Sequence, residues 1–209
     1  MYGTLGHFRI KAQKREELTA LYHLHNRENL FTTGAIGSLL YSLDNHPDRA
    51  IMVVAFDSRK AYQDNAQSPG QNERYRRYRA LLESEPEWHD GEITPFFALT
   101  DWHNLSQLYG TVARFSLKPG ADSACEEFFS HWRDEERTLE VIPGAVGTWL
   151  LRPDDEPAIA YAAVLFESKR TYVDNAASAA QDLQYRALRE WLTEDPEWFD
   201  GRVAAYHRF

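Results

Sequence analysis

Two tyrosine–asparagine pairs carry side chains whose types and spacing could do chemistry. Tyr62 precedes Asn65 by three residues, and Tyr172 precedes Asn175 by the same distance. On a helix this spacing puts both side chains on one face. The asparagine could hydrogen-bond a phenol or enolate oxygen, while the tyrosine could stack on a ring or donate a proton. In the alternative reading, the asparagine ends a short helix and the tyrosine is a core residue.

His25 is the best candidate for a general base in the first half of the chain, because a histidine pKa can be tuned near neutrality. It follows Leu18, Leu21 and Tyr22 at helical spacing, on the apolar face of a predicted helix. A histidine on such a face is more commonly a core residue with satisfied hydrogen bonds. Both interpretations remain open from the sequence.

The sequence predicts no metal site. His131 and Glu135 have the i, i+4 spacing of two metal ligands on a helix, but nothing supplies a third. Cys125 is the single cysteine, which excludes a thiolate cluster and an intrachain disulfide. Phosphate-binding loops, dinucleotide fingerprints and nucleophile elbows are also missing from the sequence.

The chain is a tandem duplication. The hexapeptide PEWHDG at 86–91 returns as PEWFDG at 196–201, and a shift of 110 aligns 34–93 with 144–203. About 25 of the roughly 60 aligned positions are identical, far above chance at a fixed offset. Upstream, a shift of 107 aligns YGTLGHFRIK with YGTVARFSLK.

Each copy has the element order βαββαβ, read from alternating and helical apolar patterns. Ser58 and Ser168 are expected to cap the helices that follow them. Expected strands lie at 2–11, 34–43, 49–57 and 91–99, then at 109–118, 144–152, 158–167 and 201–208, with helices at 13–31 and 120–140 and helical stretches within 58–82 and 168–192.

This order predicts an α+β fold of two ferredoxin-like units. One such unit leaves a bare apolar sheet face, which the second copy would cover. We therefore expect domains 1–99 and 109–209, joined by a linker at 100–108 and packed sheet to sheet as an intramolecular dimeric α+β barrel. Whether these pseudo-dimers pair further stays open.

The composition of the chain limits which binding partners and which cellular compartment we expect. The 209 residues carry 32 acidic and 23 basic side chains, a formal net charge of −9. Nucleic acid and anionic membranes repel such a surface, so neither is an expected partner. The chain begins with no apolar stretch of signal-peptide length and contains no stretch long enough for a membrane helix, so we expect a cytoplasmic protein.

Some residues that recur in both copies are expected to have a structural role rather than a catalytic or binding role. Trp88 and Trp198 follow a helix-stopping proline and precede an expected Asp-Gly turn, where a tryptophan commonly closes a core. Arg76 and Arg79 are expected to be solvated or ion-paired rather than substrate anchors.

The positions that differ between the copies predict unequal cavities, one in each half between sheet and helices. The residues at the matching positions are His25 against Trp132, Leu39 against Trp149, and His89 against Phe199. If these side chains face inward, the first cavity should be the more polar and the second smaller and drier. Ligand binding or activity should then depend on Asn65 more than on Asn175.

The motifs YGTV-R-F-LKPG, F-S---Y--NA-S--Q---YR-LR and PEW-DG resemble the antibiotic biosynthesis monooxygenase family of dimeric α+β barrels, once in each half. That family includes oxygenases of polyketide aromatics that need no cofactor, haem-degrading enzymes and members without known activity. The resemblance implies O2 as co-substrate, no cofactor, and an aromatic substrate held by asparagine, tryptophan, tyrosine and arginine side chains.

We therefore predict a cofactor-independent monooxygenase of a polyketide- or quinol-type aromatic. His25 is the expected base, Asn65 and Tyr62 hold substrate oxygens, and Trp88 forms a wall. The remaining expected substrate-binding residues are His89, Asn175, Tyr172 and Trp132.

Two other functions remain. The cavity could hold a small hydrophobic molecule without reaction, as a binding or stress-associated module. Haem degradation is disfavoured, because neither 58–82 nor 168–192 contains the histidine that would ligate the iron.

Overall fold

The structure is a computed structural model that describes residues 1–28, 33–94, 107–130 and 142–208. The first half has the predicted order of elements. They are β1 Tyr2–Arg9, α1 Arg15–Glu28, β2 Ala35–Leu43, β3 Arg49–Phe56, α2 Arg59–Ala66, α3 Pro69–Leu81 and β4 Glu87–Thr94. The second half repeats them as β5 Tyr109–Ser116, α4 Asp122–Ser130, β6 Ala145–Pro153, β7 Ile159–Phe166, α6 Lys169–Ala176, α7 Ala179–Arg189 and β8 Glu197–Arg208.

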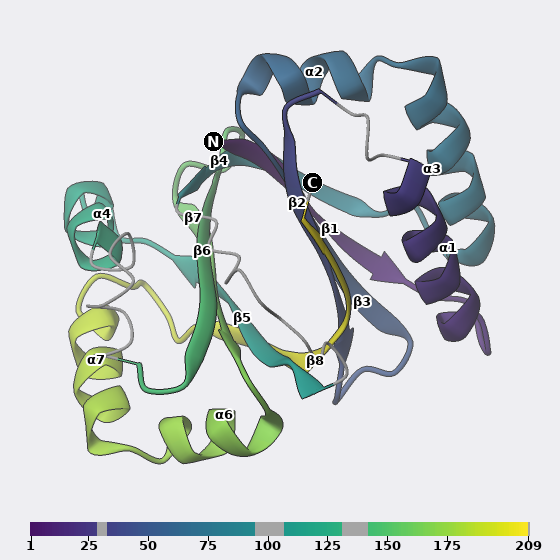
Figure 1. The fold of residues 1–209 in the computed structure, drawn as a ribbon. Helices are drawn as coiled ribbons and strands as arrows, with labels where there is room; N and C mark the ends of the chain where they lie inside the picture. The colour runs from purple at the N-terminus through teal and green to yellow at the C-terminus, as the bar shows by residue number, and fades with distance from the viewer. Residues whose placement is uncertain (29–32, 95–106, 131–141, 209) are drawn as a thin grey trace.

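The eight described strands close into one antiparallel barrel, in the order β1-β3-β2-β8-β5-β7-β6-β4. Each half contributes four neighbouring strands in the ferredoxin-like order, β4-β1-β3-β2 and β8-β5-β7-β6. The halves meet at two seams, where β4 pairs with β6 and β2 pairs with β8. Figure 1 shows α1, α2 and α3 on one outer side of the barrel and α4, α6 and α7 on the opposite side. The predicted fold class is confirmed.

The barrel interior is a core shared by both halves. Trp149 of β6 and Tyr41 of β2 are both fully buried there. The Trp149 Nε1–H donates to the Tyr41 hydroxyl oxygen at 3.1 Å. Because the two residues come from different halves, this bond ties the repeats together inside the core.

From its glutamate onward, the repeated PEW-DG hexapeptide lies in a strand, so the expected Asp-Gly turn was wrong. Gly91 of β4 pairs with β1 on one side and with Pro153 of β6 on the other. A Cβ at Gly91 would lie 1.8 Å from the carbonyl oxygen of Arg152, and one at Gly201 would lie 2.4 Å from that of Ser42. Glycine is needed at both seams because the neighbouring backbones approach closely.

Serine caps fix the helices that line the outer face of each sheet. As predicted, Ser58 caps α2 and Ser168 caps α6, each accepting a hydrogen bond from the backbone N–H three residues on. Ser68 and Ser178 cap α3 and α7 in the same way. These caps fix where each short helix begins and therefore where its tyrosine and asparagine lie.

The domain bounds 1–99 and 109–209 stay predictions, because residues 95–106, with most of the predicted linker, lie outside the described part of the chain. No helix in the described ranges is long and apolar enough to span a membrane.

Candidate functional site

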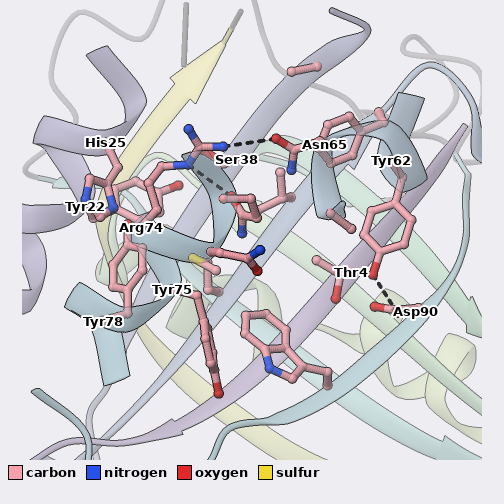
Figure 2. Close-up of a pocket in the computed structure, with 18 residues that line it drawn as sticks. Thr4, Tyr22, His25, Ser38, Tyr62, Asn65, Arg74, Tyr75, Tyr78 and Asp90 are labelled. Carbon is pink, nitrogen blue, oxygen red and sulfur yellow. Dashed lines mark hydrogen bonds between the residues drawn. The ribbon is translucent and has the colours of Figure 1, made fainter. Parts of the chain in front are cut away.

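A cavity of about 310 Å³ lies between the first-half sheet and helices α1, α2 and α3. Figure 2 shows its lining residues. His25, Tyr62, Asn65 and Trp88 all contribute to the wall, so four residues singled out in the sequence come together here. This volume suits a small ligand.

His25 lies on α1 and is 2 % exposed. Its ring meets the Tyr78 ring edge to face, with centroids 4.8 Å apart and an interplanar angle of 85°. Tyr22, one turn earlier on α1, is 1 % exposed and lines the same cavity. His25, Tyr22 and Tyr78 form one side of the cavity in Figure 2. The imidazole is thus buried at the cavity wall, as a base that acts on a bound ligand would be.

Tyr62 of α2 donates its hydroxyl proton to Asp90 Oδ2 at 2.6 Å (Figure 2). Burial, followed by the hydrogen bond and charge of Asp90, raises the pKa of Tyr62 well above its usual value. Tyr62 therefore stays protonated with its donor already engaged. The other carboxylate oxygen, Asp90 Oδ1, is buried and has no hydrogen-bond partner within the described residues.

Asn65 is held by an arginine from the next helix. Arg74 of α3 donates from Nη2 to Asn65 Oδ1 at 3.1 Å, and from Nε to Gln71 Oε1 at 3.0 Å. A guanidinium has only donors, so the accepting amide atom of Asn65 must be its oxygen. The amide nitrogen is left to donate, and a positive charge stands beside it. This pair can hold an oxygen that becomes negative.

Trp88 and Trp198 occupy matching strand positions but differ in burial. Trp88 of β4 is partly buried and packs edge to face against Phe8, with ring centroids 5.6 Å apart. Trp198 of β8 is 44 % exposed. Trp88 also lines the first cavity.

A second cavity, of about 390 Å³, lies between the second-half sheet and its helices. Tyr172 and Asn175 line it, together with Asp200, whose charge and hydrogen bond add to burial in raising the pKa of Tyr172. Asn175 is 8 % exposed, and its Nδ2 has no hydrogen-bond partner among the described residues. The rest of the wall is more apolar than in the first cavity, with Phe129 and Leu188 where Tyr22 and Tyr78 stand.

The second cavity is the larger of the two, so the size prediction was wrong, while the polarity prediction agrees with the lining residues. Trp149 and Phe199 do not fill the second cavity, because they face the barrel interior on the opposite side of the sheet. Trp132, which matches His25, lies outside the described residues.

His89 also faces the barrel interior and is not part of the first cavity. It is 5 % exposed, and its Nε2 lies 3.0 Å from the Tyr161 hydroxyl of the other half. The structure therefore separates His89 from His25, Asn65, Tyr62 and Trp88.

Arg74 and Asp90 are the site residues that sequence reasoning missed. The clue for Asp90 was the invariant aspartate of PEW-DG, which recurs as Asp200 near a repeated tyrosine. Arg74 could have been singled out because the second copy has a different residue, Gln184, at the matching position. Arg76 and Arg79 form ion pairs with Glu73 and Glu85, as expected for structural arginines.

No group of three or more His, Cys, Asp or Glu side chains is placed to hold a metal ion within the described ranges. His131 and Glu135 fall outside those ranges.

Known structures resemble this fold over nearly the whole chain. A "putative monooxygenase" from Fusobacterium nucleatum has a TM-score of 0.83 at 9 % identity, covering 99 % of this chain and 94 % of its own. A second, from Lactobacillus acidophilus, has a TM-score of 0.82 at 8 % identity, covering 99 % and 95 %. An "anthrone oxidase-like protein" has a TM-score of 0.66 at 13 % identity, covering 99 % and 92 %.

No family model and no curated protein matches the sequence. At identities this low, the structural matches establish a shared fold, and the fold resemblance inferred from the repeated motifs is confirmed.

Proposed function

We propose that the first cavity is the active site of a monooxygenase that oxidises an electron-rich aromatic with O2 and no cofactor. One observation carries the proposal. A buried histidine and an arginine-held asparagine line the same cavity of about 310 Å³, which has aromatic walls. The full-length likeness to proteins described as monooxygenases and as anthrone oxidase-like supports this class of reaction.

In the proposed reaction, His25 removes a proton from the bound phenol or its tautomer. The resulting anion is electron-rich enough to reduce O2 itself. When a ring methylene becomes a carbonyl, the substrate supplies all four electrons that O2 accepts. One oxygen atom enters the product and the other leaves as water, so no external reductant is needed.

The protein must hold this anion and keep it dry. The Asn65 amide nitrogen donates to the developing oxyanion, and the Arg74 guanidinium adds positive charge beside it. Tyr75, Tyr78 and Trp88 supply aromatic wall. Tyr62 was expected to hold a substrate oxygen by donation. Since its proton goes to Asp90, we assign it to shaping the wall and to fixing that carboxylate.

Oxygen uptake with anthrone as substrate tests the proposal. His25→Ala should lower kcat by about 100-fold or more, the range that general bases contribute. Asn65→Ala should lower it by about ten-fold or more through loss of the oxyanion donor. His46→Ala, in an exposed turn, is the matched control and should leave the rate unchanged.

Two results would contradict the proposal. If wild-type protein takes up no O2 above background with anthrone or hydroquinone substrates, it lacks the proposed activity. Equal losses from Asn65→Ala and Asn175→Ala would show two equivalent sites and remove the assignment to the first cavity.

The second cavity favours the alternative function, the binding of a hydrophobic molecule without reaction. Its wall is largely apolar, and the buried Asn175 Nδ2 has no hydrogen-bond partner within the described residues. A ligand with one carbonyl oxygen would satisfy that donor. Saturable binding of anthraquinone without O2 uptake, weakened by Asn175→Ala, would support this function over the first.

A further inference from the structure

A third hollow, of about 460 Å³, lies at one end of the barrel, and we call it the barrel-mouth hollow. Both halves line it, with His7 and Arg49 from the first and Arg114, Tyr161 and Phe199 from the second. The inward side chains of β1, such as His7, alternate with those that face the helix-side cavity. The barrel-mouth hollow is thus separate from both cavities described above.

Buried aromatic rings form its floor. The His7 ring lies 5.2 Å from that of Phe199 and 5.9 Å from that of Tyr161. Tyr161 is 1 % exposed, and its hydroxyl lies 3.0 Å from His89 Nε2. His89 Nδ1 in turn lies 3.4 Å from Glu156 Oε2.

Two side chains, Arg114 and His89, lie next to the Tyr161 hydroxyl. The Arg114 guanidinium opposes the rise in the pKa of Tyr161 that burial causes. The Tyr161 hydroxyl and His89 Nε2 share one hydrogen bond, whose direction is set by the tautomer of the imidazole. Ile51 of the first copy matches Tyr161, and Phe199 of the second copy matches His89, so the Tyr161–His89 pair has no equivalent at the symmetry-related position.

The arginines of the hollow are not ion-paired in the part of the chain that the structure describes, although Glu197 lies directly across the strand pair from Arg114. Within the described residues, neither Arg49 nor Arg114 pairs with a carboxylate. Both guanidiniums, after burial and His89, help to lower the pKa of His7 to about 4. At neutral pH His7 is therefore uncharged and offers a ring face rather than a second cation.

The carboxylates of the hollow lie at its rim. Glu87 is 73 % exposed, and Glu197 is exposed as well. Glu85 is already engaged by Arg79 and by the hydroxyl of Tyr75. The rim acids therefore leave the two guanidiniums available to a ligand.

We propose that the barrel-mouth hollow binds a small aromatic carboxylate. Arg49 and Arg114 hold the carboxylate, and the rings of His7 and Phe199 pack against the apolar part of the ligand. Guanidinium forks match carboxylate geometry, and a hollow of this volume accepts a molecule of that size. The site is independent of the proposed oxidation, since it shares no residue with the first cavity.

Benzoate is the probe, titrated into the full-length protein by calorimetry and by NMR of the His7 imidazole. Benzoate should bind and should raise the pKa of His7, because its charge offsets that of the guanidiniums. Arg114→Gln and Arg49→Gln should each weaken binding by about ten-fold or more. Arg186→Gln, an exposed arginine on α7, is the matched control and should leave the affinity unchanged.

Three results would overturn the proposal. The first is no binding of benzoate at millimolar concentration. The second is binding of neutral benzamide as tight as that of benzoate, which would remove the role of charge. The third is binding of inorganic phosphate as tight as that of benzoate, which would make the hollow a plain anion site. If Arg114→Gln fails to fold, Arg49→Gln alone decides the role of the guanidiniums.

Discussion

Replacing Gly91 by alanine should open the seam between β4 and β6. The added methyl carbon would lie 1.8 Å from the Arg152 carbonyl oxygen and 2.9 Å from the Pro153 Cα, whereas ordinary contact begins near 3.4 Å. Both neighbours are backbone atoms, so the clash cannot be relieved by a side-chain rotation. The strands must move apart by about an ångström or more, beyond the reach of their N–H···O bonds.

The cost follows from the length of the seam. Its register runs from Gly91 opposite Pro153 to Thr94 opposite Leu150. Losing roughly three ladder hydrogen bonds, at about 1 kcal/mol net each, lowers the free energy of unfolding by about 3 kcal/mol. For a chain of this size, that lowers Tm by about 6–12 °C.

Urea unfolding followed by circular dichroism and tryptophan fluorescence measures this loss. Gly70→Ala is the matched control, because its new Cβ meets only the flexible end of Arg74, at 3.3 Å. That change should alter stability by less than about 0.5 kcal/mol. Gly201→Ala, at the other seam, should also be destabilising. A midpoint for Gly91→Ala equal to that of wild type would refute the reasoning.

Two further predictions concern assembly and pH. Residues 1–99 alone should dimerise or aggregate, because the barrel face and both seam edges lose their cover; a monomer by light scattering at micromolar concentration would contradict this. Burial, followed by neighbouring basic side chains, lowers the pKa values of His7 and His207 to about 4. The unfolded chain therefore binds more protons than the native one between about pH 6.5 and 4. Tm should therefore fall as pH drops through that window, less steeply in His7→Gln; equal slopes would argue against the His7 contribution.

The sequence predicted the fold because the repeat aligns two complete sets of elements. Serine caps, apolar periodicity and the order βαββαβ all agree, and local signals that agree with the whole fold are reliable. His25, Tyr62, Asn65 and Trp88 line one cavity, since each lies on an element whose exposed and buried faces could be told apart. Their roles in binding or catalysis stay predictions.

The sequence alone did not show which side chains of β6 and β8 point into the barrel. Both faces of β6 are buried, one against helices and the other inside the barrel, so burial does not alternate along it. Trp149 could therefore be assigned to the wrong side. On β8 buried and exposed residues do alternate, but Phe199 lies before the strand expected at 201–208, so its facing was not read from that alternation. The Tyr62–Asp90 and Asn65–Arg74 hydrogen bonds could not be predicted for a different reason. A hydrogen-bond partner on another element leaves no periodic signal in the sequence.

Covalent joining of the halves has a consequence for how this protein can change over generations. In a homodimer, every substitution near the symmetry axis happens twice, and an arginine there must face its own copy. Here His7 and Arg114 occupy matching positions at the barrel mouth but are encoded by separate codons. Each can mutate alone, and Tyr161 can acquire His89 as a partner without placing the same pair across the axis. The duplicated gene thus allows the barrel mouth to become asymmetric, which the two-fold symmetry of a homodimer would forbid.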